Sequence, residues 1–151
     1  MFQALPIASI CNGKLLCVHG GISQRIKSVK SINKVYRFRE PLQKDILTDL
    51  LWADPFDNPK DAQTKDYAKN DARNISVFFG LRPVKELLKK EKLLTIVRAH
   101  QVKPNGYEFH HWEGNFPTVI TIFSAPNYEK LGNSGAVLLS NSLGGFEVRI
   151  F

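Results

Sequence analysis

Long apolar runs are absent from this sequence of 151 residues. The longest runs have about the length of a β-strand, whereas a membrane-spanning helix needs roughly 20 apolar residues. The N-terminus has no charged segment leading into a signal-like apolar stretch. We therefore expect a protein of the cytoplasm, and also of the nucleus, with no membrane partner.

Cysteine is scarce, because only Cys11 and Cys17 occur, in neighbouring apolar stretches. Two cysteines without a repeated spacing argue against a disulfide framework and against a zinc site. We expect both to be reduced thiols of the core that carry no chemistry.

Positive charge is not concentrated anywhere, although the formal net charge is +7 and the isoelectric point is about 9.5. Recognition of nucleic acid usually needs a basic stripe with aromatic platforms or a known reading motif. The lysines and arginines are instead spread over predicted helices and loops. A solvated surface is the favoured interpretation, and a nucleic-acid binder is the weakest of the functions considered.

The chain does contain enough apolar residues, 43% of the total, to bury one core. Asn12-Gly13 favours a type I′ turn between two strands. A polar loop is expected from residue 55 to about residue 72. Expected helices lie near residues 28–36, 45–51 and 83–92, and expected strands at residues 8–11, 14–18, 93–100, 106–110, 118–123, 135–139 and 146–151. This order predicts an α/β fold of one domain with a partly antiparallel sheet.

Two histidines, His19 and His100, each end an apolar run that predicts a buried strand. A strand fixes the direction of its last side chain, so nitrogen ligands for a metal are often placed there. Gly20 and Gly21 would let the backbone close around such a site. A single histidine of this kind is more often structural, but the pair is a stronger signal.

Four other residues are candidates for a cleft, each with an ordinary structural alternative. The guanidinium of Arg73 suits a phosphate or carboxylate, or forms a surface ion pair. Trp52 and Asp54 either line a cleft or cap the core. Tyr128 follows a predicted strand and either projects over a site or lies on the surface of an ordinary turn.

Five segments of the chain, taken together, resemble the phosphoprotein phosphatase family of protein serine/threonine phosphatases. They are Leu-Cys-Val-His-Gly-Gly at 16–21, Asp-Leu-Leu-Trp-Ala-Asp-Pro at 49–55, Arg-Ala-His-Gln at 98–101, Gly-Tyr-Glu-Phe at 106–109 and Thr-Ile-Phe-Ser-Ala-Pro-Asn-Tyr at 121–128. They follow the family's order along nearly the whole chain. Residues 36–41 and 116–122 are most similar to the calcineurin branch.

The resemblance implies the C-terminal part of a metallophosphoesterase-type β-sandwich with flanking helices. It implies that His19 and His100 are ligands of one ion in a centre of two divalent or trivalent ions, manganese, iron or zinc. The implied reaction is direct attack of a metal-activated water on phosphoserine or phosphothreonine, without a covalent enzyme intermediate.

By the same resemblance, Arg73 is the catalytic residue that holds the substrate phosphate, and Trp52, Asp54 and Tyr128 contact the substrate in the cleft. Asn74 stands where relatives usually have glycine, which bears on the backbone around Arg73.

Family motifs that should precede this region are missing: Gly-Asp-x-His-Gly, Gly-Asp-x-x-Asp-Arg-Gly and Gly-Asn-His-Glu. No glycine in the chain is followed by aspartate, and no asparagine is followed by histidine. The resemblance therefore implies that residues 1–151 form a partial catalytic domain without its N-terminal half, and with an incomplete metal centre. His110 and His111 are not expected to replace the lost groups. Their position in a strand-like segment favours a role at the surface or in a sheet.

Two neutral imidazoles supply too little negative charge to hold two cations close together. We therefore expect little or no activity from the chain alone. Expected partners are a phosphoprotein substrate and a regulatory subunit or a complementary N-terminal fragment, since uncovered sheet edges favour pairing. The alternative function is a pseudophosphatase, a binding module without catalysis.

Overall fold

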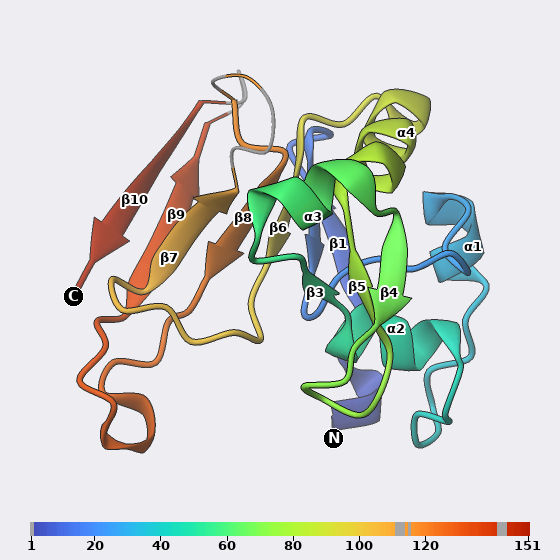
Figure 1. Ribbon diagram of the computed structural model, residues 1–151, viewed down its shortest axis with the longest axis horizontal. Helices are drawn as coiled ribbons and strands as arrows, with labels where there is room; N and C mark the ends of the chain where they lie inside the picture. Colours follow the sequence, from blue (N-terminus) through green and yellow to red (C-terminus); the bar gives the residue numbers. More distant parts are fainter. Residues whose placement is uncertain (1, 111–113, 115, 142–144) are drawn as a thin grey trace.

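A five-stranded mixed sheet forms the centre of the computed structural model, which describes residues 2–110, 114, 116–141 and 145–151 (Figure 1). Its strands in spatial order are β1 (Ala8–Cys11), β2 (Leu15–Val18), β6 (Thr95–Arg98), β8 (Val119–Ile122) and β7 (Tyr107–His110). The three central strands are parallel, and both edge strands run antiparallel to their neighbours. This confirms the α/β class with a partly antiparallel sheet.

Two smaller sheets flank the central one. One has the order β3 (Asp54–Pro55), β5 (Val77–Phe79) and β4 (Tyr67–Lys69), and the other pairs β9 (Ala136–Ser140) with β10 (Phe146–Ile150). The β9–β10 ribbon lies at the left of Figure 1, and its Phe146 packs against Phe109 of β7 with ring centroids 5.6 Å apart. The β9–β10 sheet therefore packs against the central sheet at β7.

The helices lie on the other side of the central sheet, at the right of Figure 1. They are α1 (Val29–Asn33), α2 (Ile46–Trp52), α3 (Pro59–Thr64) and α4 (Leu81–Glu91). Two short 3-10 turns, η1 (Phe2–Ala4) and η2 (Tyr128–Lys130), lie elsewhere in the chain. The longest helix, α4, buries Leu81, Val84, Leu87 and Leu88. These side chains join Leu16, Ile96 and Val119 of the sheet in one core. Among the described residues, no helix is long and apolar enough to cross a membrane.

The first hairpin forms where the sequence predicts it. Asn12 and Gly13 both have positive φ angles, 53° and 64°, as a type I′ turn requires. Strand β2 begins at Leu15 rather than Lys14, because Cys11 pairs with Leu15 and leaves three residues in the turn. The Asn12 side chain also donates hydrogen bonds to Ser140 Oγ at 3.2 Å and to the carbonyl of Asn141 at 3.0 Å, joining the hairpin to the end of β9.

The polar loop expected from residue 55 to about residue 72 is wrong, because the segment contains α3 and β4. Asn58 and Pro59 suggest a break in sequence, yet here they start a helix. Asn58 Oδ1 accepts a hydrogen bond from the backbone N–H of Lys60 at 2.9 Å, and Pro59 occupies the first helical turn.

The prediction of core cysteines is also wrong for Cys11, which is exposed, while Cys17 is half-buried. Strand β1 is an edge strand, and the β2 side chains in the core cluster are those of Leu16 and Val18, so Cys17 points to the opposite face. Both thiols are free, and burial raises the pKa of Cys17 to about 12.

His110 has the sheet role expected of it, whereas His111 lies outside the described residues. The His110 ring is buried in β7 with Nε2 2.9 Å from Thr121 Oγ1 of β8. Burial lowers the pKa of His110 to about 4, a shift that the nearby carboxylate of Glu108 opposes. The neutral ring is therefore the form that the fold accepts.

Acid should destabilise the fold through His110. Its folded-state pKa lies below its usual value of 6.5, so the unfolded chain takes up the proton first as the pH falls. We expect the free energy of unfolding to decrease by about 3 kcal/mol between pH 6.5 and pH 4 from this group. Urea titrations across this range should show a smaller decrease for His110→Gln. The exposed Glu147→Gln variant should behave like the original chain, and equal pH slopes for all three proteins would contradict the assignment.

Candidate functional site

The two histidines meet at one edge of the central sheet. β2 and β6 are adjacent parallel strands, so their carboxyl ends coincide; His19 directly follows β2 and His100 lies two residues beyond β6. His19 Nε2 and His100 Nδ1 are 3.2 Å apart, and the ring centroids are 5.0 Å apart. A hydrogen bond of 3.0 Å from the Ala99 N–H to the His19 carbonyl continues the strand pairing into the site.

The loop after His19 fits closely against the end of α2. The Gly20 N–H donates to the Leu50 carbonyl at 2.7 Å, and a Cβ on Gly20 would lie 2.5 Å from the carbonyl carbon of Leu51. Glycine is therefore required there, as the sequence suggests. The approach also places Trp52 edge-on to His100, with ring centroids 5.1 Å apart and planes at 85°.

A buried ion-pair network centred on Asp54 contacts the loop that carries His19. Asp54, whose side chain is 2% exposed, accepts hydrogen bonds from Arg98 on Oδ1 at 2.9 Å and from Arg73 Nε on Oδ2 at 3.1 Å. Asn70 Nδ2 also donates to Asp54 Oδ2 at 2.9 Å. The fully buried Arg98 donates through Nε to the Gly20 carbonyl at 2.6 Å, so one carboxylate links both arginines to the His19 loop.

Arg73 is partly exposed and forms an ion pair with the buried Asp54, so it is not an isolated surface residue. Its side chain is 32% exposed, and its NH2 group lies 3.4 Å from the His100 carbonyl oxygen. The following Asn74 has a φ of 54°, a left-handed conformation that asparagine tolerates better than most residues. The Arg73 backbone is thus compatible with asparagine where relatives have glycine.

Both imidazoles are neutral at pH 7. Burial lowers the pKa of His100 to about 4, with Arg73 and Arg98 adding to the effect and Asp54 opposing it. Burial and the same two arginines also lower the pKa of His19. A neutral imidazole presents a lone pair, which is the form that binds a metal ion.

The pair fits part of a metal site. Nitrogens bound at about 2.0–2.1 Å to one tetrahedral ion lie roughly 3.3 Å apart, close to the 3.2 Å between His19 Nε2 and His100 Nδ1. The other ring nitrogen, His100 Nε2, is not one of these two donors; it is buried with no hydrogen-bond partner in the described part of the chain. The described residues contain no group of three or more His, Cys, Asp or Glu side chains suited to a metal, so this part of the chain brings two nitrogen donors together and not a full set.

Tyr128 lies on the exposed η2 turn. Its ring packs edge-on against Phe123 at 5.3 Å, and its N–H donates to Asn133 Oδ1 at 2.9 Å. The loop that carries it extends below β7 and β8 in Figure 1. These contacts are compatible with both alternatives for Tyr128, and its place in a cleft stays a prediction.

Sequence reasoning missed Arg98 and Asn70 as site residues. Arg98 interrupts an otherwise apolar strand, and a charge in that position was the available signal. Asn70 sits in a polar stretch and gave no signal. A second buried carboxylate, Asp49 of α2, was missed as well: it accepts hydrogen bonds from Ser23 at 2.6 Å, Arg25 at 2.8 Å and Ser76 at 2.8 Å.

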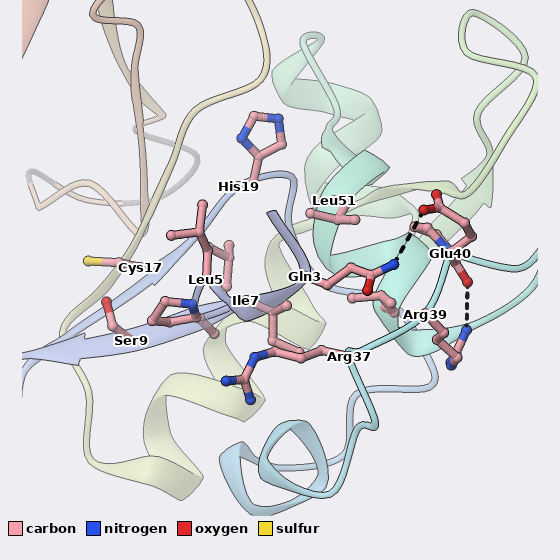
Figure 2. Close-up of a pocket in the computed structure, with 15 residues that line it drawn as sticks. Gln3, Leu5, Ile7, Ser9, Cys17, His19, Arg37, Arg39, Glu40 and Leu51 are labelled. Atoms are coloured by element: carbon pink, nitrogen blue, oxygen red, sulfur yellow. Dashed lines mark hydrogen bonds between the residues drawn. The ribbon is translucent and has the colours of Figure 1, made fainter. Parts of the chain in front are cut away.

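A cavity of about 580 Å³ opens on the other side of His19, between the N-terminal segment and residues 37–41. Figure 2 shows His19 at its upper edge above Leu5 and Ile7. Neither His100 nor Arg73 lines this cavity. The cavity therefore shares only His19 with the site formed by His19, His100 and Arg73.

Comparison with known proteins gives a consistent assignment. Residues 1–104 match the family model of calcineurin-like phosphoesterases. In Saccharomyces cerevisiae, the serine/threonine-protein phosphatase 2B catalytic subunit A1 is 42% identical over 91% of this chain, and subunit A2 is 33% identical over 99%. A solved protein serine/threonine phosphatase from the same yeast, described as similar to human phosphatase PP5, has a TM-score of 0.81 at 26% identity over 99% of this chain.

The chain is much shorter than these relatives. It spans 27% and 29% of the two catalytic subunits and 48% of the solved phosphatase.

Removing the charge of Asp54 should strongly destabilise the fold. Asp54→Asn leaves the fully buried Arg98 without its counter-ion, and breaking a buried ion pair typically costs about 3–5 kcal/mol. Urea denaturation measures this loss. Asp71→Asn is the matched control, because Asp71 pairs with Lys69 at the surface and should cost less than about 1 kcal/mol. Similar losses in both variants would show that Asp54 is not the central counter-ion.

Proposed function

This chain belongs to the calcineurin-like phosphoesterase family, and on that basis we propose that it supplies part of the catalytic site of a protein serine/threonine phosphatase. The substrate is a phosphoserine or phosphothreonine side chain of a protein. The observation that carries the proposal is the convergence of two neutral imidazoles, 3.2 Å apart, beside an arginine held by a buried carboxylate.

In this proposal His19 and His100 hold an ion of manganese, iron or zinc through His19 Nε2 and His100 Nδ1. Metal ions bound in such a centre lower the pKa of a bound water and offset charge on phosphoryl oxygens. His19 and His100 are suited to this task because their lowered pKa values keep the nitrogen lone pairs free at neutral pH.

Arg73 binds the phosphate oxygens of the substrate. Asp54 fixes the guanidinium through Nε, so the planar group is oriented before the substrate arrives and little rotational freedom is lost on binding. Arg98 has a positioning role: it ties Asp54 to the His19 loop and does not reach the substrate itself. Trp52 covers one side of the His100 ring and limits access of water from that side.

The remaining donors of a two-metal centre come, in this proposal, from a complementary N-terminal segment of the same phosphatase. Two neutral imidazoles bring no negative charge to balance two cations. The phosphoprotein substrate and this segment are the partners that the mechanism needs, and a regulatory subunit is not needed for the chemistry. Tyr128, exposed on the η2 turn, contacts the substrate protein in this proposal.

The chain alone should not hydrolyse phosphopeptide. With manganese added, the release of inorganic phosphate should stay at the level of the buffer, because two donors do not hold a metal pair in place. A malachite green assay of the purified chain measures this. Turnover at the rate of an intact relative would show that the two-donor interpretation is wrong.

A chimera tests the catalytic assignment directly. In the chimera, residues 1–151 replace the matching segment of the yeast phosphatase 2B catalytic subunit A1, which is 42% identical to this chain. The chimera should hydrolyse phosphopeptide, and Arg73→Ala should lower its kcat by about 100- to 1,000-fold, as expected for loss of a donor that stabilises transition-state charge. Arg82→Ala is the control, since Arg82 forms an exposed ion pair with Asp66.

Two outcomes would contradict the proposal. A folded chimera that binds metal and phosphopeptide but releases no phosphate would favour the pseudophosphatase. Equal activities of the Arg73→Ala and Arg82→Ala chimeras would remove Arg73 from the site.

A further inference from the structure

Two thiols lie side by side on the first hairpin, apart from the histidine and arginine cluster. Cys11 is the last residue of β1, and Cys17 is the third residue of β2. The strand register pairs Cys11 with Leu15 and Ser9 with Cys17, so both cysteines are on the same face of the hairpin in diagonal positions. Their sulfur atoms are 3.6 Å apart, with the Cys17 thiol donating to the Cys11 sulfur.

The two thiols differ in access. Cys11 is exposed, whereas Cys17 is half-buried. Figure 2 shows Cys17 next to Ser9 among the residues that line the cavity described above. A reagent from solution therefore reaches Cys11 first, and Cys17 is the neighbour that responds.

A disulfide bond between Cys11 and Cys17 would be strained, and strain makes a disulfide easier to reduce. Diagonal partners across an antiparallel pair have Cα atoms about 7–8 Å apart, whereas disulfides usually join Cα atoms about 4.4–6.8 Å apart. The hairpin must shift slightly to close the bond, and β1 can shift because only β2 pairs with it. Strained and exposed disulfides are easily reduced, which suits a reversible bridge rather than a permanent one.

We propose that Cys11 and Cys17 form a reversible dithiol–disulfide site that exchanges with low-molecular-weight disulfides such as oxidised glutathione. The Cys11 sulfur, as a thiolate, attacks one sulfur of the small disulfide, whose S–S bond breaks and releases one small thiolate. The Cys17 thiol then loses its proton to water, which its raised pKa makes the slow step, and the resulting thiolate attacks the mixed disulfide so that the second small thiolate leaves.

The balance of this exchange is complete. Two protein thiols lose two electrons and two protons, and one small disulfide becomes two small thiols. The site is independent of the phosphatase proposal, because neither cysteine takes part in that chemistry.

Mass spectrometry of the whole chain after incubation with oxidised glutathione tests the site. The original chain should lose two hydrogen atoms, remain a monomer and carry no glutathione. Trypsin cleaves after Lys14, between the cysteines, so the peptides 1–14 and 15–25 should stay joined until dithiothreitol is added. Stable glutathione adducts on the original chain, or bridges between two chains, would overturn the proposal.

Single variants separate the two roles. Cys17→Ser should stop at the mixed disulfide and carry one glutathione on Cys11, while Cys11→Ser should react roughly ten-fold more slowly at the less accessible Cys17. Equal rates for the two variants would contradict the order of attack.

A positional control tests the strain. The double variant Cys11→Ser and Ser9→Cys moves the first thiol directly opposite Cys17, where Cα atoms about 4.5–5.5 Å apart fit a disulfide. At a fixed concentration of oxidised glutathione, this bridge should need about three-fold more reduced glutathione to open than the native one, because two glutathiones react with each bridge; this is about a ten-fold change in the equilibrium constant, or about 30 mV. If both bridges open at the same concentration, the native one is not strained and the reversible role fails.

Discussion

The carboxylate of Asp54 is the interaction on which the candidate site depends. It lies in a short strand directly after α2 and binds two arginines that come from different parts of the chain. A fully buried guanidinium such as that of Arg98 is tolerated only with a counter-charge and filled hydrogen bonds. Because Arg98 also holds the Gly20 carbonyl, the same carboxylate indirectly fixes the direction of His19 and, through Arg73, the charge beside His100.

The elements with local signals could be predicted from sequence. The hairpin has the Asn-Gly pair that its turn requires, α4 has the apolar spacing of an amphipathic helix, and the family motifs identify the phosphoesterase fold that the comparisons confirm. The convergence of His19 and His100 was also within reach, because each ends a strand and parallel neighbours end at the same edge. Their role as metal ligands stays a prediction.

The helix that starts at Asn58 and Pro59 was missed although its signals are local: asparagine caps a helix and proline suits its first turn, and the Lys60 N–H donates to the Asn58 side chain. The other errors depended on tertiary contacts. The thiol of Cys11 is in an apolar stretch, yet the position of β1 at the sheet edge leaves it in solvent. Asn70 and Asp49 are ordinary polar residues in the sequence, and their importance comes from buried partners that lie 16 to 27 residues away.

The hydrogen bonds from Asn12 to Ser140 and Asn141 have a consequence for the order of folding. They join positions 128 and 129 residues apart, and β2 pairs with β6 across about eighty residues. Contacts of such sequence separation slow folding, since the chain loses loop entropy before it gains the contact. During synthesis the hairpin leaves the ribosome long before its partners exist. Its exposed edge is thus open to other nascent chains, and a chaperone that covers strand edges would raise the yield of folded protein.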